Sequence, residues 1–93
     1  MIRSFANSAT RRFYEEEKAD KFPGIDVDIL RELLSMLNQA SSLSEISPLS
    51  SVGLHPLKGD RKGQWSIKVN RGWRLCFRFS KGDVYDLEIV DYH

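Results

Sequence analysis

The sequence predicts an α+β domain in which helices in the first half of the chain precede an antiparallel sheet in the second half. Between residues 7 and 37, apolar residues recur at helical spacing, whereas between residues 65 and 89 they alternate with polar ones, as in half-buried strands. The chain has 93 residues, 41% of them hydrophobic, which suits one compact core. We therefore expect a single domain over residues 1–93.

The first expected helix begins at Asn7 or Ser8, either of which can cap it, and its apolar members are Ala9, Phe13 and Tyr14. The segment 15–24 that follows is rich in charge and ends on Pro-Gly. Because this segment offers little to bury, we predict a mobile loop there.

Asp26 is placed to cap a second helix. The apolar face of this helix consists of Val27, Leu30, Leu33, Leu34 and Leu37. We interpret that face as part of the core, since the stripe is too short for a partner-binding zipper. The serine-rich stretch 41–51 is expected to be a connector with at most one helical turn.

Three strands follow as a meander, and their alternating apolar positions are Trp65, Ile67 and Val69, then Trp73, Leu75, Phe77 and Phe79, then Tyr85, Leu87 and Ile89. These positions share one face only if Val69 opposes Trp73 and Phe79 opposes Asp83. Both hairpins then need three-residue loops, 70–72 and 80–82, and each has glycine in third place. The opposite, polar face would carry Lys68, Arg74 and Glu88 in one row.

The formal net charge is only +1, but the charges are unevenly distributed. One acid, Asp60, stands among the bases of residues 55–82, which are Lys58, Arg61, Lys62, Lys68, Arg71, Arg74, Arg78 and Lys81. The next segment carries Asp83, Asp86, Glu88 and Asp91. A phosphate-binding surface would have this pattern. A solvated sheet face with cross-strand ion pairs would have it too, and that is the more ordinary interpretation.

Several classes of protein are not expected. The apolar runs are too short for a transmembrane helix, and the N-terminus does not read as a signal peptide. A single cysteine, Cys76, suits a reducing compartment, so we expect a cytoplasmic protein. Two histidines and one cysteine make a structural zinc site improbable, and we expect no cofactor.

Two motifs carry the functional prediction. Residues 54–66 read L-H-P-L-K-G-D-R-K-G-Q-W-S, and the chain ends in D-Y-H after a W-R-L-C-F-R-F strand. Together they resemble the signature of the HigB (host inhibition of growth) toxins, a branch of the RelE-like toxin–antitoxin superfamily, and the resemblance covers essentially the whole chain. It implies the RelE-like microbial ribonuclease fold, with two helices packed on a small twisted antiparallel sheet.

The same resemblance implies a ribosome-dependent endoribonuclease that cleaves messenger RNA without a metal and so inhibits translation and growth. It also implies a helix-turn-helix antitoxin, which neutralises the toxin and connects it to operator DNA. Matched by motif, the catalytic positions are His55, Lys58, Asp91, Tyr92 and His93. Arg74 matches an arginine expected near the scissile phosphate. Cys76 departs from the family, where threonine or a similar small residue is expected.

The residue types fit that chemistry. The 2′-hydroxyl of RNA can act as nucleophile if a base takes its proton and an acid protonates the leaving oxygen. Histidine titrates near neutrality, so His93 and His55 are candidates for these two roles, in an order that the sequence leaves open, and Asp91 could orient them. Tyr92 could stack on a base.

Cations would stabilise the phosphate, and the basic block adds Arg61, Lys68 and Arg78 to Arg74 as candidate phosphate-binding residues. Strict alternation from Ile89 puts Tyr92 on the polar face but Asp91 and His93 on the core side. A bulge, or a strand that outruns the sheet, would resolve this. Two other functions remain open: a non-catalytic inhibitor that occupies the ribosome, and an interaction domain that acts in co-repression.

Overall fold

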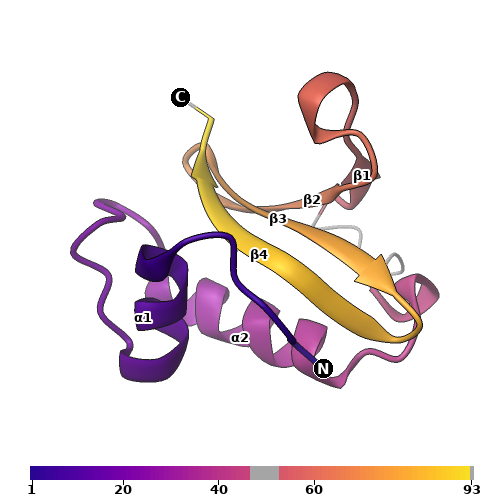
Figure 1. Cartoon of the computed structure of the whole chain (residues 1–93). Helices are drawn as coiled ribbons and strands as arrows, with labels where there is room; N and C mark the ends of the chain where they lie inside the picture. Colours follow the sequence, from indigo (N-terminus) through magenta and orange to yellow (C-terminus); the bar gives the residue numbers. More distant parts are fainter. Residues whose placement is uncertain (47–52, 93) are drawn as a thin grey trace.

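The computed structural model describes residues 1–46 and 53–92. Within these ranges, the helices α1 (Ser8–Glu16) and α2 (Val27–Gln39) cover one face of a twisted four-stranded antiparallel sheet (Figure 1). The strands follow chain order: β1 (His55–Pro56), β2 (Trp65–Asn70), β3 (Trp73–Ser80) and β4 (Asp83–Asp91). Single 3₁₀ turns, η1 (Leu43–Glu45) and η3 (Gly59–Arg61), precede β1 and β2 respectively. This arrangement confirms the predicted fold class.

Both helices begin at the predicted capping residues. The side chain of Asn7 accepts a hydrogen bond from the backbone N–H of Thr10 at 2.9 Å, and that of Asp26 accepts one from Ile29 at 3.0 Å. The four leucines of α2 are buried, as predicted, and Val27 packs partly buried against them. In α1, Phe13 is buried, whereas Tyr14 stays 38% exposed. No helix in the described residues has the length and hydropathy needed to cross a membrane.

The segment between the helices is packed more tightly than its composition suggested. The expectation that residues 15–24 have little to bury is wrong, because α1 extends to Glu16 and Phe22 is only 6% exposed. The ring of Phe22 meets that of Trp73 edge-on, with centroids 5.6 Å apart, and the Trp73 indole N–H donates to the carbonyl of Pro23 at 3.1 Å. Asn70 also bonds to this segment, donating from Nδ2 to the carbonyl of Gly24 at 3.0 Å. The segment is therefore fixed to the β2–β3 hairpin.

The described part of the serine-rich connector, residues 41–46, contains the turn η1. The rest of the connector, 47–51, lies outside the described residues.

The β2–β3 register was predicted correctly along the strands but not at the turn. Ile67 pairs with Leu75 and Lys68 pairs with Arg74, as expected. The hairpin, however, closes with Asn70 opposite Trp73 and a two-residue turn. The register shift between Lys68 and Asn70 absorbs the extra residue as a β-bulge. Both turn residues, 71 and 72, have positive φ, which is the two-residue hairpin geometry that matches the strand twist.

The β3–β4 hairpin departs further from the prediction. Phe79 pairs with Val84 instead of Asp83, and a second bulge shifts the register between Cys76 and Arg78. The extra residue lies on β4, where Asp86 adopts a φ of 53°. Aspartate tolerates this left-handed conformation better than most side chains. The bulge changes which residues of β4 face the core.

Before the bulge, Val84 is fully buried and Tyr85 is 36% exposed, so the assignment of Tyr85 to the core face is wrong. After the bulge, Leu87 and Ile89 face the core as predicted. The predicted polar row is also only half right. Lys68 and Arg74 are neighbours, but Val90 pairs with Arg74, whereas Glu88 pairs with Cys76.

The N-terminal segment closes the free edge of β4. Ile2 and Phe5 form parallel bridges with Val84 and Leu87 (Figure 1). The backbone N–H of Arg3 donates to the carbonyl of Val84 at 2.7 Å, and its side chain pairs with Asp83 at 3.2 Å. This pairing covers the backbone groups that an edge strand would otherwise expose.

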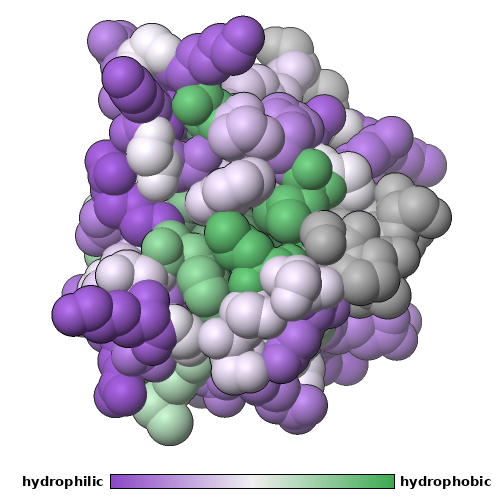
Figure 2. Space-filling model, turned by 90° about the vertical axis from the view of Figure 1, so that its right-hand side faces the viewer, coloured by the Kyte–Doolittle hydropathy of each residue, from purple (hydrophilic) through white to green (hydrophobic). Residues whose placement is uncertain are grey.

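The core lies between the helices and the sheet, and Phe13, Leu30, Leu37, Leu75 and Phe77 are among its fully buried side chains. Figure 2 shows that some hydrophobic side chains also reach the surface on one side of the molecule. Neither α1 nor α2 covers the opposite face of the sheet (Figure 1). The candidate site lies on that face.

Candidate functional site

Arg74 is the centre of a polar cluster on the sheet face that the helices leave open. It projects from β3, where its side chain is partly buried. Its Nη1 lies 3.3 Å from Nε2 of His55 on β1 and 3.5 Å from Oγ of Ser66 on β2. Its guanidinium carbon lies 5.6 Å from the ring centre of Tyr92, within the range of a cation–π contact. Residues from β1, β2 and the segment after β4 thus converge on one cation on β3.

The two ring nitrogens of His55 have different neighbours. An arginine can only donate, so Nε2 of His55 must accept from Arg74. The other ring nitrogen, Nδ1, lies 3.3 Å from the carbonyl of Pro56 and must be the one that donates. The pairing of His55 with Ser66 holds the residue at the sheet edge.

Tyr92 lies on the polar face, as strict alternation predicted, and it lies just beyond the end of β4. Its backbone N–H donates to the carbonyl of Gly72 at 2.8 Å, so the end of the chain is tied to the β2–β3 turn. Its hydroxyl is 3.9 Å from Sγ of Cys76. Desolvation raises the pKa of the Tyr92 phenol, and the neighbouring Cys76 adds to the effect. The phenol therefore stays protonated at neutral pH.

Cys76 and Ser66 form the floor of the cluster. Both are fully buried, although they belong to the face without helices. Burial raises the pKa of the Cys76 thiol above its ordinary value, so the thiol stays protonated at neutral pH.

Arg61 and Glu88 form an ion pair beside this floor. Nη1 of Arg61 donates to Oε1 of Glu88 at 3.1 Å and to Oε1 of Gln64 at 3.0 Å. The side chains of the pair are 33% and 26% exposed. The hydrogen bond to Glu88 raises the pKa of the Arg61 guanidinium, which is charged in any case.

The structure brings together some of the residues that the sequence suggested. Arg74 contacts both His55 and Tyr92, and Lys68 lies next to Arg74 with its side chain exposed. Lys58 is exposed at the start of η3.

Other candidates lie further from Arg74 or beyond the described residues. Arg78 is engaged by Asp86 at 3.4 Å, beside the second bulge. Asp91 is exposed and pairs with Trp73 in the sheet. His93 lies outside the described residues.

Ser66 and Glu88 belong to the cluster but were not among the predicted site residues. Their alternation with core residues already put them on the polar face. For Glu88, an acid within a basic surface was a signal that it would pair with a cation. For Ser66, the sequence held no signal, because a serine on a solvated strand is ordinary.

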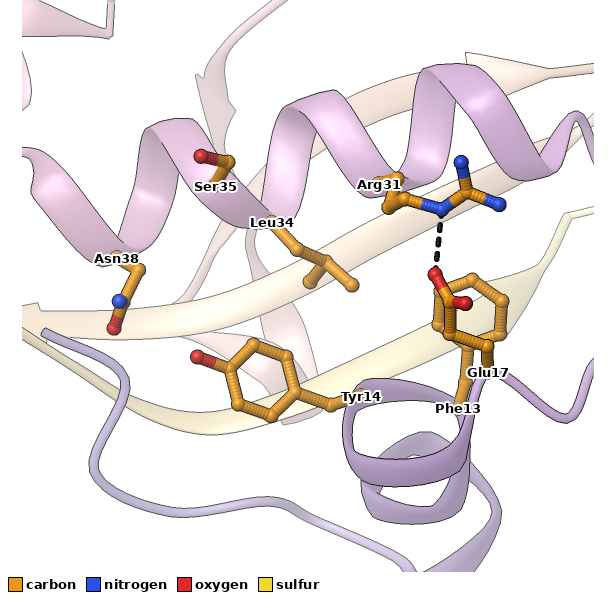
Figure 3. A pocket seen from close by; sticks show the side chains of 7 residues that line it. All are labelled: Phe13, Tyr14, Glu17, Arg31, Leu34, Ser35 and Asn38. Atoms are coloured by element: carbon orange, nitrogen blue, oxygen red, sulfur yellow. Dashed lines mark ion pairs between the residues drawn. The ribbon is translucent and has the colours of Figure 1, made fainter.

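Two further observations concern metal binding and the location of a surface hollow. Among residues 1–46 and 53–92, no group of three or more His, Cys, Asp or Glu side chains is arranged to hold a metal ion. A separate open hollow of about 240 Å³ lies between α1 and α2 (Figure 3), so it belongs to the helical layer and not to the polar face. Arg31 and Glu17 form an ion pair of 2.6 Å across this hollow.

The chain is similar to known toxins along its whole length. Residues 3–93 match the family described as "RelE-like toxin of type II toxin-antitoxin system HigB". The protein named Endoribonuclease HigB from Proteus vulgaris is 39% identical over 93 residues, which is 100% of both chains.

Solved structures support the same fold. The structure of YafQ from E. coli strain BL21(DE3) superposes with a TM-score of 0.66 at 18% identity, covering 98% of this chain and 91% of that one. The YoeB/ParE toxin from Agrobacterium tumefaciens gives a TM-score of 0.53 at 19% identity, with 96% of each chain covered. At such identities these structures are evidence for the fold alone, and they confirm the RelE-like architecture.

Proposed function

This chain belongs to the HigB family of RelE-like toxins of type II toxin–antitoxin systems, and from this premise we propose that it is an endoribonuclease that cleaves messenger RNA. The observation that carries the proposal is the position of Arg74, in contact with both the imidazole of His55 and the ring of Tyr92. At one place, a cation can bind the scissile phosphate, an imidazole can take the proton of the 2′-hydroxyl, and an aromatic ring can stack on a base of single-stranded RNA.

Arg74 binds the scissile phosphate in this proposal. Within the described part of the chain, Arg74 contacts His55, Ser66 and Tyr92 and forms no ion pair with a carboxylate. Its positive charge is therefore available to the phosphate and to the charge that develops there in the transition state. Lys68 and Lys58, both exposed, extend the positive potential along the RNA backbone.

His55 is the general base. Its Nε2 faces Nη1 of Arg74 in the free chain, and when Arg74 donates to the bound phosphate instead, the lone pair of Nε2 is free to take the proton of the adjacent 2′-hydroxyl. Proton transfer to Nε2 lets the 2′-oxygen form a bond to phosphorus, and the bond from phosphorus to the 5′-oxygen breaks. The products are a 2′,3′-cyclic phosphate and a 5′-hydroxyl. His93 supplies the proton to the leaving 5′-oxygen, Asp91 orients it, and Tyr92 stacks on a neighbouring base.

The partners and the compartment follow from the same proposal. The substrate is messenger RNA held by the translating ribosome in the cytoplasm, because a small open site has few side chains of its own to hold an extended RNA. A helix-turn-helix antitoxin neutralises the toxin and carries it to operator DNA.

A cleavage assay on translating ribosomes tests the proposed function. We expect the intact chain to cut ribosome-bound messenger RNA within the coding sequence, and the variant H55Q to lose most of this activity while melting like the wild type. Mapping of messenger RNA 5′ ends in cells that express the chain gives the same answer in vivo. Growth arrest without new 5′ ends would favour the non-catalytic ribosome inhibitor. Neither arrest nor cleavage would favour the co-repressor domain.

A further inference from the structure

We propose that Arg61 and Glu88 act together as a positioning pair that holds the loop of residues 57–64 against the sheet, and that Arg61 is not a phosphate ligand. The inference rests on the proposed function and assigns two residues of the same site. It replaces the expectation that Arg61 binds the RNA backbone.

The 57–64 loop has little of its own to hold it in place. Its turn η3 contains no buried residue, and residues 58–60, 62 and 63 are all exposed. The backbone N–H of Leu57 donates to the carbonyl of Gln64 at 2.9 Å, which closes the loop but does not attach it to the far strands. The ion pair of Arg61 with Glu88, 27 residues away in sequence, links the loop to β4.

The path of the ion pair explains an unusual pattern of burial. Cys76 pairs with Ser66 on one side and with Glu88 on the other, so these three residues form a row across β2, β3 and β4. Arg61 comes from the loop beside β2 and reaches Glu88 at the far end of this row. Ser66 and Cys76 are fully buried on the face that α1 and α2 leave open. We infer that the loop and the Arg61 side chain cover them.

The attachment bears on the catalytic geometry because the loop begins next to His55. β1 consists of His55 and Pro56 alone, and it pairs with β2 through two residue pairs. A strand this short depends on its neighbours for a fixed position. Release of the 57–64 loop would therefore loosen His55 relative to Arg74, whose 3.3 Å contact defines the site. Lys58 lies in the loop itself.

The surroundings of Arg61 also argue against a role in binding phosphate. Its Nη1 already serves two acceptors, Glu88 and Gln64, and the carboxylate offsets its charge. A phosphate would have to displace this partner and leave a half-buried carboxylate unpaired, which costs free energy. Among the described residues, Arg74 forms no ion pair that a phosphate would have to displace.

Three glutamine variants test the inference: R61Q and E88Q in the pair, and K62Q as the matched control that removes an exposed charge from the same loop. We expect R61Q and E88Q each to lower kcat about tenfold or more with little change in KM, since small displacements of catalytic groups are costly. The kcat of the double variant should be no lower than that of either single variant, because both substitutions remove the same link. The salt dependence of RNA binding should not change.

Amide hydrogen exchange supplies a readout that does not depend on cleavage. The N–H groups of Lys62 and Gln64 bond within the loop, and we expect them to exchange faster in R61Q and E88Q but not in K62Q. If these amides exchange at the wild-type rate in both R61Q and E88Q, the pair does not position the loop. A rise in KM for R61Q alone, with the salt slope reduced by about one, would identify Arg61 as a phosphate contact instead. An inactive wild type would contradict the proposed function, while the exchange data would still decide on the pair.

Discussion

Arg74 donates from Nη1 to Nε2 of His55 across 3.3 Å, although 19 residues separate them in the sequence. The contact forms because β1 and β3 flank β2, where Ser66 pairs with both His55 and Cys76. A flat arginine group thus meets the imidazole on one side and the ring of Tyr92 on another. The geometry of this guanidinium, beyond its charge, is what the site depends on.

Replacing Arg74 with lysine should therefore disable the site while keeping the charge. A lysine ammonium cannot contact the histidine and stack on the tyrosine ring with the same planar group. We expect R74K to reduce cleavage about 10²-fold, a loss typical for one transition-state donor, and to change the free energy of unfolding by less than about 0.5 kcal/mol. Single-turnover cleavage and urea unfolding measure the two effects. R71K, at the exposed β2–β3 turn, is the control, and equal activity of the two variants would contradict the prediction.

Removal of His93 should disarm the protein without unfolding it. The residue follows the last core residue of β4, Ile89, by four positions, so its loss exposes little apolar area. We expect stability to change by less than about 0.5 kcal/mol and cleavage to fall on the order of 10²-fold, as for loss of one proton-transfer group. The shortened chain should still bind its antitoxin. Cleavage at the wild-type rate would rule out His93 as the catalytic acid.

Phe22 should stabilise the fold far more than its charged neighbours in the same segment. Its ring is buried against Trp73, so F22A should lower the free energy of unfolding by about 3 kcal/mol through lost burial and the cavity that remains. The adjacent Lys21 is exposed, and K21A should change the free energy of unfolding by less than about 0.5 kcal/mol. Urea unfolding followed by tryptophan fluorescence compares the two variants. Similar values for both would mean that the segment is not packed in solution.

Cys76 should be unreactive in the folded protein. The thiolate is the reactive form, and burial raises the pKa of this thiol, so at about pH 8 the folded chain holds less thiolate than the unfolded chain does. Burial also blocks the approach of a reagent. We expect an aromatic disulfide reagent to label Cys76 much more slowly in the native protein than in urea. Rapid labelling of the native protein would show that the floor of the site is open.

The sequence predicted the elements of this fold better than their exact register. Helix caps and the leucine face of α2 follow from local chemistry, so Asp26 was correctly identified and Asn7 was one of the two caps considered for α1. The bulge at Asp86 could not be predicted, because alternation assumes a regular strand and an aspartate in the left-handed region looks like any other polar residue. Tyr85 was consequently placed on the wrong face.

The site residues that belong to a sequence motif could be predicted. Those whose position depends only on packing could not. His55, Arg74 and Tyr92 were all suggested by sequence motifs, and the structure places them in contact. The partner of Arg61 could not be predicted, since it depends on the register shift that puts Glu88 opposite Cys76. The predicted register would have put Glu88 beside Arg74 and neutralised the cation on which the site depends.

The pairing of residues 1–6 with β4 has a consequence for the order of folding. The first residues of the chain bond to partners about 80 positions away, as in the hydrogen bond of Asp86 N–H to Ser4 Oγ at a separation of 82. Closing so large a loop costs more entropy than forming adjacent hairpins, so the β2–β3–β4 meander should assemble first and the N-terminal segment should dock last. In native-state hydrogen exchange, the amides of Arg3 and Ala6 should then open more readily than those of β3.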